Sequence, residues 1–101
     1  MPKLFTYGTL QDESVQLALF NKTLKGSIDS IIGFEKQEIT LDGVIYPILV
    51  KNNKSTKVIK GTCYDLSDQE ILICDEYEGN EYKRIVIELC SGIEAWVYIS
   101  S

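Results

Sequence analysis

The sequence of 101 residues contains no histidine, and this absence excludes several kinds of chemistry. Nucleophilic mechanisms that use a Ser-His-Asp or Cys-His arrangement need an imidazole as the base. Histidine is also the commonest protein ligand for metal ions. If the protein is an enzyme, its proton carrier must therefore be a carboxylate, a lysine, a tyrosine or a thiol.

Cysteine is scarce, because the sequence holds only Cys63, Cys74 and Cys90, without a C-x-x-C pair. An odd number of widely spaced thiols fits a reducing compartment and does not fit a structural zinc site. Each cysteine has apolar neighbours, so we expect all three to be small buried hydrophobic residues. We expect no metal and no other cofactor.

Long apolar runs are missing too, since none approaches the ~20 residues that span a bilayer. The first ten residues contain one lysine but no signal-peptide core or cleavage site. These features predict a cytoplasmic protein without a membrane partner. The net charge of −5 argues against nucleic acid as a partner, because such binding depends on clustered cations. The lysine-rich residues 51–60 are interpreted as a solvated hairpin loop between two strands.

Length and composition indicate a single domain over residues 1–101, with 45% apolar and 25% charged residues. Helices are predicted after Asp12, a candidate N-cap, and at residues 68–78. Strands are predicted at residues 4–7, 24–39, 44–50 and 57–66 and, as an antiparallel pair, on either side of residues 91–94. This order predicts an α+β fold, a small mixed, mostly antiparallel β-barrel with two short flanking helices.

Glycine and proline add detail to the strands. The Asp-Gly pair at residues 42–43 predicts a hairpin turn. Pro47 cannot donate to a ladder, so its strand is expected at a sheet edge or with a bulge. Gly61 indicates a bulge or a close approach of two backbones.

The second helix has clear boundary signals and one acid in an unusual place. S-D-Q-E at residues 67–70 is a capping box, and Gly79 is a typical stop. At ~100° per residue, Glu78 projects between Ile71 and Cys74, on the apolar side. Desolvation and the carbonyl ends of the last turn would both raise its pKa towards the range of a general base. The alternative is a frayed helix end that leaves Glu78 in water.

The segment around Glu78, D-E-Y-E-G-N-E-Y-K-R at residues 75–84, holds further polar side chains. Arg84 is the only arginine, and we expect it to pair with one of the nearby acids. Tyr77 and Tyr82 are interpreted as packing in the core or at a rim rather than as catalysts.

Several segments together resemble the gamma-glutamylcyclotransferase-like family, in particular the short single-domain branch that includes the gamma-glutamylamine cyclotransferases. The resemblance extends over residues 3–99. YGTL near the start, followed much later by D-x-Y-E-G-x-x-Y-x-R, is its most specific part. The segments are YGTL at residues 7–10, YP at 46–47, GTCYDL at 61–66, DEYEGNEYKR at 75–84 and AWVY at 95–98.

This resemblance implies a cavity in which a gamma-glutamyl amide cyclises to 5-oxoproline and releases its amine. Glu78 matches the family's catalytic glutamate, and Tyr7, Gly8, Thr9 and Leu10 match its substrate-binding segment. The substrate's α-amine would attack its own γ-carbonyl while Glu78 carries the proton. Backbone N–H groups of the glycine loop would bind the carbonyl oxygen or the α-carboxylate. The identity of the leaving amine stays open.

Two other functions remain possible on the sequence alone. A barrel of the same fold could bind a gamma-glutamyl-like or other carboxylate ligand without chemistry. A protein-interaction module could use the edge strand near Pro47 or the lysine-rich loop.

Overall fold

The computed structural model describes all residues, 1–101, as seven strands, two α-helices and a short 3-10 helix. Both predicted helices are present, and the second has the predicted bounds. Neither helix has the length and apolar composition that crossing a membrane requires. In chain order the elements are β1 (Lys3–Thr6), η1 (Thr9–Gln11), α1 (Glu13–Phe20), β2 (Gly26–Ile31), β3 (Phe34–Leu41), β4 (Val44–Lys51), β5 (Ile59–Asp65), α2 (Asp68–Glu78), β6 (Tyr82–Glu88) and β7 (Glu94–Ser100).

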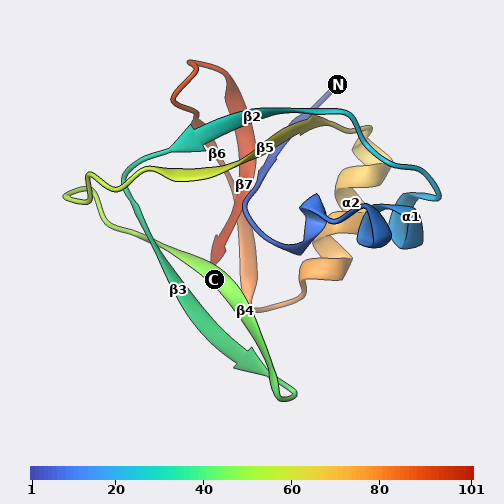
Figure 1. Ribbon diagram of the computed structural model, residues 1–101, viewed down its shortest axis with the longest axis horizontal. Helices are drawn as coiled ribbons and strands as arrows, with labels where there is room; N and C mark the ends of the chain where they lie inside the picture. The colour runs from blue at the N-terminus through green and yellow to red at the C-terminus, as the bar shows by residue number, and fades with distance from the viewer.

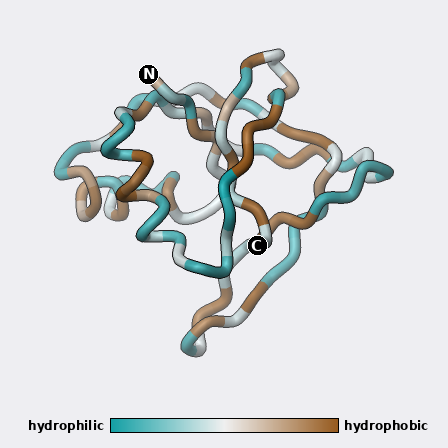
Figure 2. Tube along the Cα trace, turned by 180° about the vertical axis from the view of Figure 1, so that it is seen from behind, coloured by the Kyte–Doolittle hydropathy of each residue, from teal (hydrophilic) through white to brown (hydrophobic).

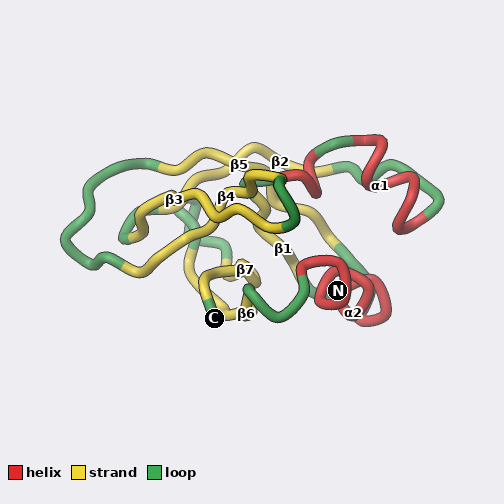
Figure 3. The backbone as a smooth tube through the Cα atoms, turned by 90° about the horizontal axis from the view of Figure 1, so that it is seen from below, coloured by secondary structure: helices red, strands yellow, loops and turns green.

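The strands form two sheets, a five-stranded one in the order β2-β5-β1-β7-β6 and the β3-β4 hairpin. All neighbours are antiparallel except β1 and β7, whose parallel pairing places Leu4 opposite Trp96. Both helices lie at the same side of the strands, and the hairpin extends away from them (Figures 1 and 3). The predicted mixed, mostly antiparallel α+β architecture is confirmed, although backbone hydrogen bonds do not close the strands into one barrel.

The five-stranded sheet separates two hydrophobic clusters. Along β1, Phe5 belongs to one cluster and Leu4 to the other, and along β7 the same holds for Val97 and Tyr98. This alternation follows from the two-residue period of a strand. Full burial of one large apolar side chain contributes about 1.5–3 kcal/mol. Both faces of the sheet therefore stabilise the fold, and apolar residues concentrate along its central strands (Figure 2).

The turn chemistry predicted from the sequence is confirmed at two places. Asp42 and Gly43 have φ angles of 50° and 77°, and they connect Leu41 to its partner Val44 in a tight hairpin. A Cβ atom at Gly61 would collide with the carbonyl oxygen of Thr6, so two backbones do meet closely there. The strand with Pro47 pairs on one side only, with β3, as expected for an edge strand.

The lysine-rich segment was wrongly predicted as a hairpin loop. β4 and β5 belong to different sheets and do not pair, so residues 52–58 form a crossing between the sheets. The local turn signals were correct, because the Ser55 N–H donates to the carbonyl of Asn52. A local turn does not specify which strand the chain joins next, and that choice depends on tertiary packing.

The cysteine prediction is correct for two residues and wrong for the third. Cys63 and Cys74 are buried, whereas Cys90 is exposed. Cys90 follows the last residue pair of the β6-β7 ladder and lies in the turn between these strands. A turn at the end of a sheet faces solvent even when its neighbours in sequence are apolar.

Candidate active site

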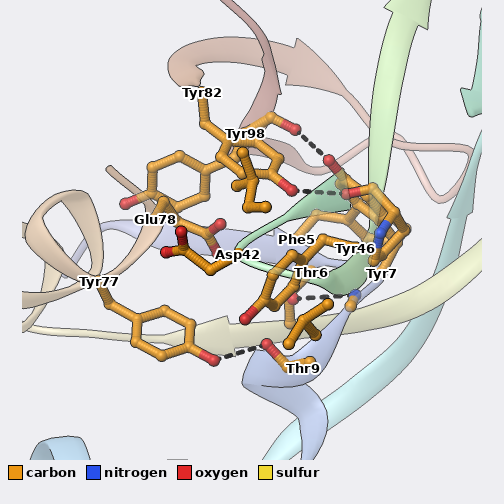
Figure 4. A pocket seen from close by; sticks show the side chains of 14 residues that line it. Phe5, Thr6, Tyr7, Thr9, Asp42, Tyr46, Tyr77, Glu78, Tyr82 and Tyr98 are labelled. Atoms are coloured by element: carbon orange, nitrogen blue, oxygen red, sulfur yellow. Dashed lines mark hydrogen bonds between the residues drawn. The ribbon is translucent and has the colours of Figure 1, made fainter. Parts of the chain in front are cut away.

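A cavity of about 270 Å³ lies between the β3-β4 hairpin, the carboxyl end of β1 and the end of α2 (Figure 4). Its wall also includes residues of β6 and β7, so segments that lie far apart in sequence meet there. Five of the six tyrosines line it: Tyr7, Tyr46, Tyr77, Tyr82 and Tyr98. The wall contains no lysine, arginine or cysteine.

The position of Glu78 follows from how α2 begins and ends. At its start, the Ser67 hydroxyl accepts from the Glu70 N–H at 3.1 Å, and the Glu70 carboxylate accepts from the Ser67 N–H at 2.8 Å. This is the predicted capping box, and it determines where the helix begins. Ile71 and Cys74 are buried, and a residue four positions after Cys74 lies on the same face. Glu78 therefore points inward and lines the cavity.

The environment of Glu78 combines burial with the lack of a counter-ion. None of the three ion pairs in the structure includes it. Burial raises the pKa of Glu78 to about 7. A carboxyl group with a pKa near neutrality can both accept and return a proton. The predicted direction of the shift is confirmed.

Tyr7, Tyr82 and Tyr98 keep their hydroxyl protons and serve as hydrogen-bond donors. Burial raises the pKa of Tyr82 to about 12, and burial also moves the pKa values of Tyr7 and Tyr98 well above their usual range. Tyr7 donates to the carbonyl of Tyr98, and Tyr82 donates to the carbonyl of Pro47, both at 2.7 Å. The second bond joins the two sheets at the cavity. The Tyr46 hydroxyl makes no hydrogen bond within the chain.

The loop after β1 brings its backbone to the cavity. Tyr7, Gly8 and Thr9 line it, and a Cβ atom at Gly8 would lie only 3.3 Å from the Pro47 ring. Thr9 shares a hydrogen bond with the Tyr77 hydroxyl at 2.7 Å, which ties the loop to the last turn of α2 (Figure 4). The first N–H groups of a helical turn have no partner within it. Groups of this kind are suited to bind an oxyanion or a carboxylate.

Leu10 differs from the other three residues of its segment. Its side chain is buried in the cluster on the helix side of the sheet, and it does not line the cavity. The structure therefore brings together Glu78, Tyr7, Gly8 and Thr9. Leu10 anchors the loop that carries Tyr7, Gly8 and Thr9.

Asp75 lies one turn before Glu78 and has the opposite environment. Arg84 donates to both of its oxygens, at 2.8 and 2.9 Å, and the Tyr98 hydroxyl donates at 2.7 Å. The bonds from Arg84 hold the pKa of Asp75 below its usual value. The guanidinium also stacks 4.1 Å from the centre of the Trp96 ring. The predicted pairing of Arg84 with a nearby acid is confirmed, and it fixes α2 to β6 and β7.

Sequence reasoning did not assign a role at the site to Asp42, Tyr46 or Tyr98. The first two belong to the β3-β4 hairpin and the third to β7, far from YGTL and Glu78 in sequence. The Asp-Gly turn signal located Asp42 but not the cavity that it reaches. Tyr77 and Tyr82 were expected in the core or at a rim, and both lie in the cavity wall with bonded hydroxyls. No group of three or more cysteine, aspartate or glutamate side chains is placed to hold a metal ion.

Comparison with known protein families shows to which family the chain belongs. The model of the family described as gamma-glutamyl cyclotransferase, AIG2-like, matches residues 4–101, so the chain belongs to this family. It is 32% identical over 89 residues to AIG2-like protein C of Arabidopsis thaliana, which covers 85% of this chain and 48% of that protein. AIG2-like protein A of Arabidopsis thaliana is 32% identical over 87 residues, covering 83% and 49%. The chain thus spans about half the length of these relatives.

Solved structures show the same fold. A solution structure of an Arabidopsis thaliana protein superimposes with a TM-score of 0.79 at 22% identity, covering 98% of this chain and 61% of that one. Part of the Kluyveromyces lactis allophanate hydrolase superimposes with a TM-score of 0.77 at 20% identity, covering 99% of this chain and 17% of that one. The fold therefore occurs both in small proteins and as one part of a large enzyme.

Proposed function

We propose that this protein is a gamma-glutamyl cyclotransferase, which converts a gamma-glutamyl amine or peptide into 5-oxoproline and a free amine. Glu78 is the general acid and base of this reaction. The proposal is supported by the family and above all by one observation: Glu78 is a half-buried carboxyl without a counter-ion, and burial raises its pKa to about 7, in a cavity whose wall holds no lysine, arginine or cysteine.

The candidates for the proton carrier can be narrowed by elimination. The chain has no histidine, and the cavity wall has no lysine and no cysteine. Three wall tyrosines have pKa values far above neutrality. The only carboxylates in the wall are Glu78 and Asp42, and Asp42 is exposed at the tip of a hairpin. Glu78 is the group whose environment suits proton transfer.

The reaction needs one proton carrier and a substrate held in a folded conformation. Glu78 takes a proton from the substrate's α-ammonium, and the resulting amine attacks the γ-carbonyl carbon to close a five-membered ring. The new C–N bond leaves negative charge on the carbonyl oxygen. The original amide C–N bond then breaks as the proton on Glu78 passes to the departing amine. The ring nitrogen gives its remaining extra proton to the vacated Glu78 carboxylate, which passes it to the freed amine. Nucleophile and electrophile belong to one molecule, so correct folding in the cavity supplies much of the rate.

The cavity wall offers hydrogen-bond donors that could stabilise the negative charge on the carbonyl oxygen. The Gly8 N–H already donates to the Thr6 hydroxyl at 3.5 Å, so the backbone N–H groups of Thr9 and Leu10 and the unpaired Tyr46 hydroxyl are the candidates to bind the γ-carbonyl oxygen or the α-carboxylate. Both groups belong to rigid elements, because the loop is tied to Tyr77 and Tyr46 lies in a paired strand. Preorganised donors stabilise a transition state without the cost of reorienting water.

The direct test is release of 5-oxoproline from a panel of gamma-glutamyl amines and dipeptides, measured by mass spectrometry. We expect product with the wild type and none above background with Glu78→Gln. Glu76→Gln is the matched control, because Glu76 is an exposed acid of the same helix that does not line the cavity. Substantial turnover by Glu78→Gln would exclude Glu78 as the base. Saturable binding without product from any panel member would support a ligand-binding barrel instead.

The cytoplasmic location stays a prediction.

A further inference from the structure

The charges on the cavity wall are all of one sign. Its only charged side chains are Asp42 and Glu78, although the chain has ten lysine and arginine residues in total. Arg84, the cation on neighbouring β6, is occupied by Asp75. A cavity with acidic walls and no cation favours positively charged ligands and repels negative ones.

Asp42 lies at the tip of the β3-β4 hairpin, on the exposed side of the cavity. It forms none of the ion pairs in the structure, and its carboxylate points towards the same space as Glu78 (Figure 4). Its φ of 50° and the 77° of Gly43 are those of a turn that Asn-Gly satisfies equally well. The turn therefore needs a residue that tolerates positive φ, and it does not need a negative charge.

If the proposed function holds, the two carboxylates meet different parts of the substrate. The γ-glutamyl group is common to all substrates, and its α-ammonium must reach half-buried Glu78. The amine part is the variable one. Asp42 is the exposed acid of the wall and Glu78 the more buried one, so a substrate whose α-ammonium lies at Glu78 would extend its amine part towards Asp42. Tyr46 and Tyr77 also line this cavity, and aromatic rings add favourable contact for a cation.

We propose, on the basis of the proposed cyclotransferase function, that Asp42 determines substrate specificity. It selects γ-glutamyl amides whose departing amine carries a second, positively charged group, and it disfavours those whose amine carries a carboxylate. A γ-glutamyl diamine belongs to the first class. A γ-glutamyl dipeptide with a free C-terminal carboxylate belongs to the second.

The test uses three γ-glutamyl amides whose amine parts share one straight carbon chain. The far end of that chain is an ammonium, a methyl group or a carboxylate. At low salt we expect kcat/KM to fall in that order, by roughly threefold per step of charge and about tenfold between the ends. Asp42→Asn should reduce the spread to about twofold, and added salt should reduce it in the wild type.

Two controls separate charge from folding and from catalysis. Asn adopts positive φ readily, so Asp42→Asn keeps the hairpin, and Glu38→Gln removes an exposed acid of β3 that does not line the cavity. Glu38→Gln should keep the wild-type order. Equal kcat/KM for the three amides, or an undiminished wild-type spread in Asp42→Asn, would overturn the proposal.

Calorimetry measures the Kd of each amide, so it tests the charge selection independently of turnover. We expect the Kd values of the three amides to follow the same order, and Asp42→Asn to bring them together. If no amide yields 5-oxoproline but the Kd values still depend on Asp42, the proposed function fails and the charge selection stands. If the wild type binds all three equally, or binds none, the selection is wrong.

Discussion

Asp75 and Glu78 lie one helical turn apart on α2, yet their carboxylates have opposite environments. Asp75 receives two hydrogen bonds from Arg84 and one from Tyr98, which keep its pKa low. Glu78 receives none from the chain and has no counter-ion, and burial raises its pKa to about 7. The chain's only arginine is thus placed beside the acid that does not face the cavity.

Under the proposed function, this difference gives Asp75 a structural role and Glu78 a chemical one. A paired carboxylate stays ionised and holds two elements together, here α2 and β6. An unpaired, desolvated carboxylate costs stability but exchanges a proton near neutral pH. The rigidity provided by Asp75 supports the position of Glu78, because both belong to the last two turns of one helix.

The largest expected effect is on turnover. Glu78→Gln should lower kcat/KM by about 10²–10⁴, the range usual for loss of a general base. Asp75→Asn leaves the base in place, so its loss should be at most about tenfold. The comparison needs both variants on the substrate that the wild type prefers. Equal losses would show that the two acids act as one unit.

The second prediction concerns the pH dependence of kcat/KM. We expect its acid limb at about pH 7, falling about tenfold for each pH unit below that value as Glu78 takes up a proton. Asp75→Asn should leave the limb in place, because Asp75 is already ionised throughout this range. A limb near pH 4.5 would assign the reaction to an ordinary, solvated carboxylate.

The third prediction is that the two substitutions change stability with opposite signs. The pKa of Glu78 is raised, so its ionisation destabilises the fold increasingly from about pH 4.5 to 7. Glu78→Gln should therefore raise the free energy of unfolding by about 1–3 kcal/mol at pH 8 and by much less at pH 5.

Asp75 contributes in the other direction. Its lowered pKa stabilises the fold above the usual carboxyl pKa, and this contribution is lost as pH falls through the lowered value. Asp75→Asn should cost about 1–2 kcal/mol at pH 7, since the pair is partly exposed. Denaturant unfolding of both variants at two pH values measures the signs. A stabilising Asp75→Asn would contradict the structural role.

The smallest expected effect concerns the contact that ties the loop to α2. Tyr77→Phe removes the hydrogen bond to Thr9 and keeps the ring. We expect kcat/KM to fall about two- to fivefold, because one partly exposed hydrogen bond contributes about 0.5–1 kcal/mol. Steady-state kinetics measure this effect, and Tyr64→Phe, on the buried helix side of the sheet, is the control. A hundredfold loss would indicate that Tyr77 itself takes part in the chemistry.

Local signals were sufficient to predict α2 and its inward-facing acid. The capping box and Gly79 gave the helix bounds, and the helical period placed Glu78 beside Ile71 and Cys74. The Asp-Gly turn and the edge position of Pro47 were also predicted from local chemistry. Such features depend on a few neighbouring residues, so a single sequence contains the information that they need.

Features that depend on distant pairing were not predictable in the same way. The sequence did not show that residues 52–58 cross between sheets, or that Asp42 reaches the cavity wall. It indicated that Arg84 pairs with an acid but not that the partner is Asp75. The exposure of Cys90 likewise depends on where the β6-β7 turn ends in space. These choices are made by tertiary packing, which overrides local pattern.

The most direct test of Glu78 as a desolvated, unpaired acid is titration of its side-chain carboxyl by NMR, with its resonance assigned by its loss in Glu78→Gln. We predict an apparent pKa of about 7 for Glu78 and a value below the usual carboxyl range for Asp75 in the same sample. A Glu78 pKa near 4.5 would mean that its carboxylate is solvated or paired in solution, and it would contradict the assignment of Glu78 as the proton carrier.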